Sequence, residues 1–226
     1  MMHKHDSAAD PILEEMSAFF TARLEGYDPH MLANVEGCKE AYPLLASLLP
    51  PESSRLLDLG CGTGLELDFI FQRFPSMQVT GIDLTESMLE ALRGKHPDKQ
   101  LQLICGDYFS TDFGKGIFDC AVSVESLHHF AKERKLTLYR RLFDALVPGG
   151  CYLECDYMVE TQAEEDFFFA ECARLRKAQD IPQETFIHYD TPCTVENQLA
   201  LLRRAGFSRV EHRFRKGATS VIVAQK

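Results

Sequence analysis

Short apolar runs alternate with stretches of helical periodicity from about residue 53 to the end of the chain. Nearly continuous apolar strands that alternate with helices are typical of a parallel sheet. The pattern therefore predicts an α/β fold. The expected strands are residues 55–59, 77–83, 101–105, 117–124 and 151–157, and two further strands, 209–214 and 219–224, close the chain.

The helices between these strands have recognisable ends. Residues 65–74 have helical periodicity and stop before Pro75, which cannot donate a helix hydrogen bond. Thr85 is placed to cap the next helix, and Gly94 is a natural terminator for it. Two more helices are expected, one from about Lys132 to the Pro148-Gly149-Gly150 turn and one over 194–205.

Two helical segments precede the first strand, at about residues 10–24 and 36–49. The residues between them include Gly, Asp-Pro and Asn, which favour turns, so the sequence predicts a loop there. Because both helices come before the sheet, they can only pack over it. The predicted organisation is a helical cap segment, residues 1–52, and a main domain, residues 53–226.

Residues 158–193 interrupt the alternation, because a connection after a strand normally has ~2 to 6 residues. This lid-like insertion is expected to have structure of its own. Thr161 and Glu164 have the spacing of a capping box that opens a helix, and Pro182 follows the helical stretch. Three consecutive phenylalanines, Phe167 to Phe169, spread over ~200° of a helix, so at least one is expected to face a pocket or a partner.

The charge balance disfavours nucleic-acid partners. The chain of 226 residues has 24 Lys and Arg against 34 Asp and Glu, a net charge of −10, and a field of this sign repels phosphate backbones. No uncharged apolar stretch approaches the ~20 residues of a membrane helix, and the N-terminus lacks the apolar run of a signal peptide. We therefore expect a cytoplasmic protein without a membrane span.

One basic cluster opposes the overall charge. Such a cluster is most often a solvated face, and the alternative is a surface that meets an acidic partner. Its members are Arg203, Arg204, Arg209, Arg213, Arg215 and Lys216.

The eight cysteines are expected to be free thiols, because they contain no C-x-x-C pair and several lie in apolar runs. Cys151 and Cys155 would lie ~13 Å apart on one strand, too far to share a metal. The pairs His3/His5 and His128/His129 lack companions at metal-ligand spacing. No metal is therefore expected.

A glycine-rich segment, Asp58-Leu59-Gly60-Cys61-Gly62-Thr63-Gly64, joins the first strand of the main domain to its first helix. Glycines at such a turn let the backbone approach a ligand closely, and the helix N-terminus points N–H groups at it. The third glycine of the dinucleotide fingerprint would fall at Leu65, and a P-loop Gly-Lys-Ser/Thr is absent. The loop therefore suits a ligand with an adenosine but no pyrophosphate.

Residues 56–64, LLDLGCGTG, resemble motif I of the class I S-adenosylmethionine-dependent methyltransferases, of the small-molecule kind (types 11 and 25). Four further segments resemble the family in chain order: Asp83, Gly106-Asp107-Tyr108, the run from Phe118-Asp119 to Ser126-Leu127-His128-His129-Phe130, and Leu146-Val147-Pro148-Gly149-Gly150. The resemblance, over residues 54–157, implies a Rossmann-like fold. Its sheet would have seven strands, mostly parallel with the last antiparallel, helices on both faces, an N-terminal helical cap and an insertion after strand five.

The resemblance also implies S-adenosylmethionine as the cofactor. The cofactor-binding residues would be Asp58, Gly60, Cys61, Gly62, Gly64, Asp83, Leu84, Gly106, Asp107, Tyr108 and Glu125. In the family, the acid at the position of Asp83 binds both ribose hydroxyls, and one carboxylate can accept both bonds. The segment that contains Asp107 frames the adenine.

The residues themselves leave alternatives open. Asp83 would otherwise cap the helix that starts near Thr85. Asp58 would either orient the glycine backbone or hold the methionine ammonium through water. Asp107 would accept the adenine amino group or form an Asx-turn, and Tyr108 would pack beside the adenine or cover the sheet edge.

Methyl transfer from a sulfonium is a displacement in which alignment and exclusion of water supply much of the rate, so no base is obligatory. If the acceptor must lose a proton, the candidates are Glu125 and His128, just past strand four. If the turn there is helical, the two share a face, and the carboxylate of Glu125 would hold one ring nitrogen of His128. His128 is otherwise a buried, backbone-bonded ring, and His129 is expected to be structural.

The function predicted is methyl transfer to a small-molecule acceptor by in-line displacement, in a monomer or homodimer. Tyr27, His30 and His188 lie in segments able to line the acceptor pocket. One alternative is a quinone or lipid-like acceptor, suggested by Phe19, Phe20 and the three phenylalanines of the insertion. The other is a non-catalytic S-adenosylmethionine-binding protein, because the cofactor motifs are clearer than the catalytic ones.

Overall fold

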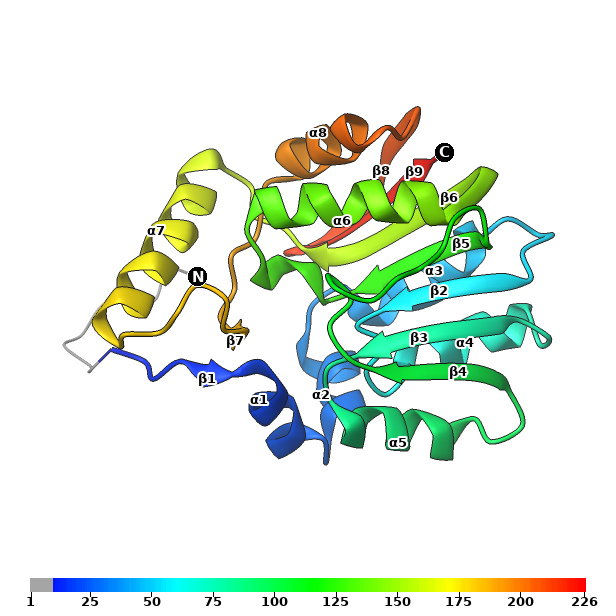
Figure 1. Ribbon diagram of the computed structural model, residues 1–226, viewed down its shortest axis with the longest axis horizontal. Coiled ribbons are helices and arrows are strands. Elements are labelled where there is room, and N and C mark those ends of the chain that lie inside the picture. Colours follow the sequence, from blue (N-terminus) through cyan, green and yellow to red (C-terminus); the bar gives the residue numbers. More distant parts are fainter. Residues whose placement is uncertain (1–9) are drawn as a thin grey trace.

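A seven-stranded sheet runs through the part of the chain that the computed structural model describes, residues 10–226 (Figure 1). In spatial order its strands are β4 (Gln100–Cys105), β3 (Gln78–Asp83), β2 (Arg55–Leu59), β5 (Phe118–Val124), β6 (Leu146–Tyr157), β9 (Thr219–Gln225) and β8 (Arg209–Lys216). All neighbours are parallel except β9, which is antiparallel to both β6 and β8. The predicted mostly parallel sheet with an antiparallel last strand is confirmed.

Helices cover both faces of the sheet, and successive residues of a strand contribute to different cores because side chains alternate across a sheet. In β2, Leu56 packs in the core formed with α3 (Cys38–Leu48), α4 (Leu65–Arg73) and α5 (Glu86–Lys95). Leu57 packs in the opposite core, with α6 (Lys132–Ala145) and α8 (Val195–Ala205). Both leucines are fully buried.

The predicted loop between the two N-terminal helices is wrong, because residues Tyr27–Asn34 form a helix, α2. Gly26 takes a left-handed conformation (φ 83°) just before it, and Pro29 lies in the first turn, where its missing N–H costs nothing. The same residue types therefore start a helix here instead of marking a loop.

Two predicted stops also differ from the structure. Gly94 lies inside α5, which continues to Lys95. The Pro148-Gly149-Gly150 segment is part of β6, which starts at Leu146 and pairs with β5 through an irregular register between Phe118 and Cys120.

The insertion contains α7 (Gln162–Ala178) and the short strand β7 (Ile187–His188). The capping box is present with both of its hydrogen bonds, between Thr161 and Glu164. The three phenylalanines point to different surroundings, as expected: Phe167 is 54% exposed, the Phe168 ring contacts Tyr157, and Lys132 lies over the Phe169 ring.

A second, two-stranded sheet joins the insertion to the N-terminal segment. In it β1 (Glu14–Glu15) pairs antiparallel with β7, directly before α1 (Met16–Arg23). The pairing is extended by the bond from Met16 N–H to the Phe186 carbonyl and by Gln179, whose amide side chain bonds the backbone of Leu13 and Pro11. Figure 1 shows α1, β7 and α7 on the side toward which the parallel strands point, their carboxyl ends.

Among the described residues all eight cysteines are free, as predicted, and no helix is long and apolar enough to cross a membrane. His3 and His5 lie outside the described residues. The division of the chain at residue 53 stays a prediction.

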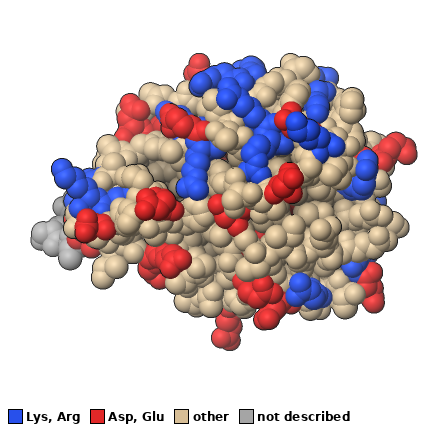
Figure 2. Space-filling view, in the orientation of Figure 1, with Lys and Arg blue, Asp and Glu red and all other residues tan. Residues whose placement is uncertain are grey.

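Basic side chains gather on the upper part of the face in Figure 2, over α6 and α8. Several members of the predicted basic cluster are paired within the chain. Arg209 and Arg213 form ion pairs with Glu211, and Lys216 forms one with Glu40. These contacts fit a solvated face.

Candidate active site

The glycine loop closes tightly over the ends of β2 and β3. Gly60, Gly62 and Gly64 all have positive φ (70°, 47° and 68°), a conformation that residues with a Cβ rarely adopt. A Cβ on Gly60 would lie 2.2 Å from the Ser126 hydroxyl, and one on Gly64 would lie 2.3 Å from Leu92. Glycine is therefore required at positions 60 and 64 by space as well as by backbone conformation, and at position 62 by backbone conformation.

Asp83 lies at the end of β3 and binds this loop. Its Oδ2 accepts a hydrogen bond from Gly62 N–H at 2.9 Å, and its Oδ1 accepts one from Thr85 N–H at 2.8 Å. Burial raises the pKa of the carboxyl, and these two backbone bonds oppose the rise. Each oxygen keeps a further lone pair, so the helix-start role and the ribose-binding role predicted for Asp83 are compatible.

Beneath the loop lie two buried carboxyls, Asp58 and Glu66. Asp58 and Glu66 hydrogen-bond to each other, and neither oxygen of Asp58, nor Oε1 of Glu66, has a partner outside this pair among the described residues. Burial raises the pKa of Glu66 to about 7, and burial together with Glu66 raises that of Asp58 well above its usual range. Buried polar atoms without partners are costly, so a ligand group that donates hydrogen bonds would be stabilising here. Sequence reasoning missed Glu66.

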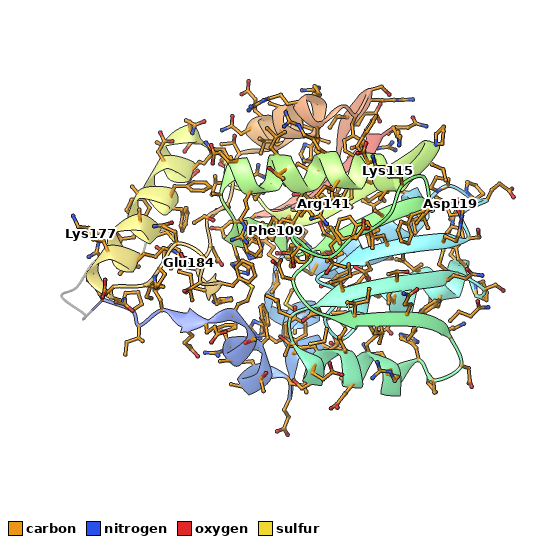
Figure 3. The ribbon with its side chains drawn as sticks, viewed as in Figure 1. Phe109, Lys115, Asp119, Arg141, Lys177 and Glu184 are labelled. Atoms are coloured by element: carbon orange, nitrogen blue, oxygen red, sulfur yellow. The ribbon has the colours of Figure 1, made fainter. Side chains whose placement is uncertain are left out.

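The three residues expected to frame the adenine, residues 106–108, lie in different surroundings. Tyr108 lines the small cavity at the loop, and its hydroxyl lies 3.1 Å from the Ser126 hydroxyl. Gly106 and Asp107 do not line this cavity, and Asp107 Oδ1 accepts from Phe109 N–H at 2.7 Å, which is an Asx-turn. Arg141 of α6 donates to the Tyr108 and Phe109 carbonyls and lies near Phe109 in Figure 3. This bonding fixes the segment.

The small cavity has a volume of about 50 Å³, which is room for a few water molecules but not for a nucleoside. Its floor includes Gly60, Gly62, Asp83, Leu84, Tyr108 and Glu125 from the predicted cofactor set. Its roof is made by Met16 and Phe20 of α1 and Tyr27 of α2. Cys61 and Gly64 do not line it. The roof must move for a nucleoside to bind.

A second cavity, of about 870 Å³, adjoins the first. The three residues expected to line an acceptor pocket, Tyr27, His30 and His188, all line this cavity. Four residues line both cavities, namely Phe20, Tyr27, Glu125 and His129. The second cavity is therefore the place where an acceptor would meet a ligand held at the glycine loop.

His128 lies at the wall of the larger cavity, in a single 3-10 turn (Leu127–His129) after β5. Its Nδ1 lies 2.5 Å from Asp156 Oδ1, so this nitrogen donates to the carboxylate. Glu125 Oε2 is 3.9 Å from the same nitrogen. Glu125 and His128 therefore share a face and form an ion pair as expected, but the ring donates its hydrogen bond to Asp156 at the end of β6, which the sequence did not indicate.

Glu125 has a different environment. Its backbone is left-handed (φ 46°), which is uncommon for a residue with a side chain and is often found at functional sites. Its Oε1 accepts from the Thr219 hydroxyl at 3.4 Å. Burial, with Asp156 nearby, raises the pKa of this carboxyl to about 7.

The histidines of the cavity differ in charge. Burial disfavours the charged ring of His128, but the carboxylates of Asp156 and Asp190 outweigh it and raise the pKa to about 9. Burial, reinforced by the His128 cation, lowers the pKa of His129 well below its usual range. Burial also lowers the pKa of His188. At neutral pH, His128 is therefore the cationic ring of this group.

The insertion supports His128 directly, which the sequence did not reveal. The carbonyl of His128 accepts from Thr191 N–H at 2.7 Å and from the Thr191 hydroxyl at 3.0 Å. Asp190 Oδ1 lies 3.6 Å from His128 Nε2. The only sequence signal for Asp156 was its place at the carboxyl end of a parallel strand, where such sheets present functional groups.

Carboxylates from distant segments also give the histidines the companions that their sequence spacing lacked. Oxygen and nitrogen atoms of His128, His129 and Asp190 lie close enough together to contact one ion, and so do those of Glu125, His128 and Asp156. That no metal ion takes part in the function stays a prediction.

The β1–β7 pairing leads to an expectation about motion. Because the roof of the small cavity and the insertion are joined, residues 10–34 and 158–193 are expected to open together and to exchange amide hydrogens faster than β2 and β3. Both segments should slow when cofactor and acceptor are present together. Hydrogen exchange measured by mass spectrometry checks this. Protection equal to that of the central strands without ligand would show a static cover.

Several known proteins that are similar in sequence to this chain are methyltransferases. The sequence profile of the family "Methyltransferase domain" matches residues 56–150. An O-methyltransferase of Penicillium expansum is 26% identical over 92% of this chain and 75% of its own length. A trans-aconitate 2-methyltransferase of Variovorax paradoxus is 31% identical over 51% of this chain and 43% of its own length.

Solved structures share the fold. Human N-acetylserotonin methyltransferase, in complex with S-adenosylmethionine, superposes with a TM-score of 0.67 at 17% identity, over 94% of this chain and 59% of that one. An O-methyltransferase family protein of Burkholderia thailandensis gives a TM-score of 0.66 at 17% identity, over 92% and 61%. The chain thus spans about 60% of these two structures and 43% of the Variovorax enzyme.

Proposed function

Because the chain contains a class I S-adenosylmethionine-dependent methyltransferase domain, we propose that it transfers a methyl group from that cofactor to a hydroxyl of a small molecule bound in the larger cavity. The observation that carries the choice of a hydroxyl is the His128–Asp156 pair at 2.5 Å. A hydroxyl is a poor nucleophile until its proton is removed, and a histidine held by a carboxylate can remove it.

The residues at the glycine loop fit this cofactor. No side chain stands at Gly60, Gly62 or Gly64, so the backbone of the loop can lie directly against the ligand. Asp83 would accept from the ribose hydroxyls, and Tyr108 would lie at the adenine. The carboxyl pair of Asp58 and Glu66, three of whose oxygens have no partner outside the pair, suits the ammonium of the methionine part. Of the predicted set, Asp107 has its Oδ1 already engaged.

When bound, the cofactor supplies a methyl group on a sulfonium sulfur. Asp156 holds Nδ1 of His128, so once the ring has lost its proton, above its raised pKa, Nε2 can accept one from the acceptor on the side of the larger cavity. Thr191 fixes the backbone of the same residue. Phe20 and Tyr27, which line both cavities, would exclude water from the point of transfer.

The related proteins are named for different acceptors, so their names do not identify the acceptor of this chain. They include a trans-aconitate 2-methyltransferase, a 24-methylenesterol C-methyltransferase and a phosphoethanolamine N-methyltransferase. A lipid-like acceptor is less well supported, because only Phe19 and Phe20 of the aromatic residues that suggested it line the larger cavity. Phe167 is exposed on α7 instead.

Two measurements test the proposed function. S-adenosylmethionine and its demethylated product are expected to raise the melting temperature, whereas NAD and ATP are not, since a ligand at 100 times its Kd adds about 2.7 kcal/mol to the folded state. A shift with NAD alone would contradict the cofactor assignment. Incubation with labelled cofactor and a pool of metabolites should then label a small molecule. Cofactor binding without any labelled product would favour the non-catalytic alternative.

A further inference from the structure

Acidic residues outnumber Lys and Arg among the residues that line the larger cavity. Four carboxylates line it, from Glu25, Glu36, Glu125 and Asp190, and Asp156 lies directly behind His128. Arg23 is the one lysine or arginine among the lining residues, and its guanidinium is already bound to Glu14 at 3.1 Å. The charge of the cavity is therefore negative, even with His128 protonated, and it disfavours an anionic acceptor.

The carboxylates divide by depth. Glu125 is buried beside His128 at the boundary with the small cavity. Glu25 and Glu36 are exposed lining residues, just before the start and just past the end of α2. Lys216 is near Glu36 but is held by Glu40 at 2.6 Å and does not line the cavity. The solvent side of the cavity thus has two carboxylates of its own.

Aromatic rings form the walls between these two depths. The Phe19 ring stacks on His188 at 3.4 Å between centroids, and Phe20 lies edge-on to Tyr27 at 6.1 Å. Tyr157 is 5.9 Å from the His128 ring. Both faces of Phe19 are covered, by His188 and by the Arg23 guanidinium at 3.6 Å, so a flat ring bound between these walls would meet Phe19 edge-on.

Building on the proposed function, we propose that the acceptor is a phenolic amine: its hydroxyl toward His128, its ring between the aromatic walls and its ammonium toward the solvent side of the cavity, in the negative field of Glu25 and Glu36 at the two ends of α2. The same arrangement rejects acceptors that carry a carboxylate. Each exposed carboxylate contributes modestly because solvent screens it, so the selectivity comes from the sum of several charges.

Three probes with one phenol ring and different side-chain charge test this: 4-hydroxyphenethylamine, 4-hydroxyphenethyl alcohol and 4-hydroxyphenylacetate. Binding is measured by calorimetry with the demethylated cofactor present, and turnover with labelled cofactor. The amine is expected to bind about tenfold more tightly than the alcohol and about a hundredfold more tightly than the acid, with the difference shrinking in high salt. Equal binding of amine and acid would overturn the proposal, and so would no binding of any of the three.

Two double variants test whether Glu25 and Glu36 cause the preference for the amine. Glu25→Gln/Glu36→Gln should reduce the preference for the amine over the acid about tenfold or more. The matched control is Glu52→Gln/Glu90→Gln, which removes two exposed carboxylates that do not line the cavity. An equal loss of preference in the control would show a general charge effect and contradict the assignment.

The two proposals fail in different ways. Selective binding of the amine without any methyl transfer would defeat the proposed function and leave the charge selection standing. Transfer to all three phenols at similar kcat/KM would leave the function standing and defeat the charge selection.

Discussion

His128→Ala is expected to reduce kcat by about 10²- to 10⁴-fold while cofactor affinity stays within about fivefold. The reason is that the ring is the group in the larger cavity placed to take a proton from the acceptor, and it makes no contact with the glycine loop that a cofactor needs. Asp156→Asn should leave the ring in place but release its orientation and charge partner. Both variants are compared by single-turnover kinetics and by calorimetry with the cofactor.

The pH dependence of kcat/KM tests whether His128 acts as a base. Since the pKa of His128 is raised to about 9 in the free protein, kcat/KM should rise with pH toward that value, above the ~6 to 7 of an ordinary histidine that the sequence suggests. His128→Ala should flatten the rise. Asp156→Asn should move it to lower pH, because removing the carboxylate lowers the pKa of the ring.

Two further variants complete this test. Glu125→Gln is expected to reduce turnover less than His128→Ala, because Glu125 is 3.9 Å from the ring nitrogen and Asp156 is 2.5 Å from it. His212→Ala, on the exposed strand β8, is the matched control and should leave turnover unchanged. If activity falls only in step with cofactor affinity, His128 belongs to the cofactor pocket and transfer proceeds by alignment alone.

Asp83→Ala should weaken binding of S-adenosylmethionine by one to three orders of magnitude, about 1.5 to 4 kcal/mol, because it removes the acceptor for two ribose hydroxyls. The variant also loses the bonds to Gly62 and Thr85, so its folding stability should fall by about 1 to 2 kcal/mol. Calorimetry measures the affinity and denaturant titration the stability. Unchanged affinity with reduced stability would show that Asp83 only holds the loop.

Two other aspartates make this result specific. Asp98→Ala, in an exposed turn before β4, is the control and should change neither quantity. Asp107→Ala decides between its two predicted roles. Weaker cofactor binding would assign the carboxyl to the adenine, and a loss of stability alone would assign it to the Asx-turn with Phe109.

The sheet could be predicted because its signals are local. Apolar runs, the glycine loop and Asp83 each lie within a few residues of the strand end that defines them, so one sequence window is enough. The loop assigned to residues 25–35 failed for the same reason, since Gly26 and Pro29 are as compatible with the first turn of α2 as with a turn.

The surroundings of His128 could not be predicted in the same way, because they are assembled from distant segments. Asp156 comes from β6, Thr191 and Asp190 from the insertion, and each reaches His128 only through the fold. The sequence placed a carboxylate next to the ring but chose Glu125, which is nearer in the chain. Proximity in sequence was the only information available for that choice.

The two-stranded sheet of β1 and β7 has a consequence for transplanting specificity between relatives. Glu14 and Glu15 align with His188 and Ile187, so the backbone register of one segment sets the position of the other. A chimera that exchanges only the N-terminal segment, or only the insertion, would join strands that were never matched to each other. It would misplace Phe19 against His188 and, two residues further on, Asp190 against His128. The two segments are therefore best exchanged together.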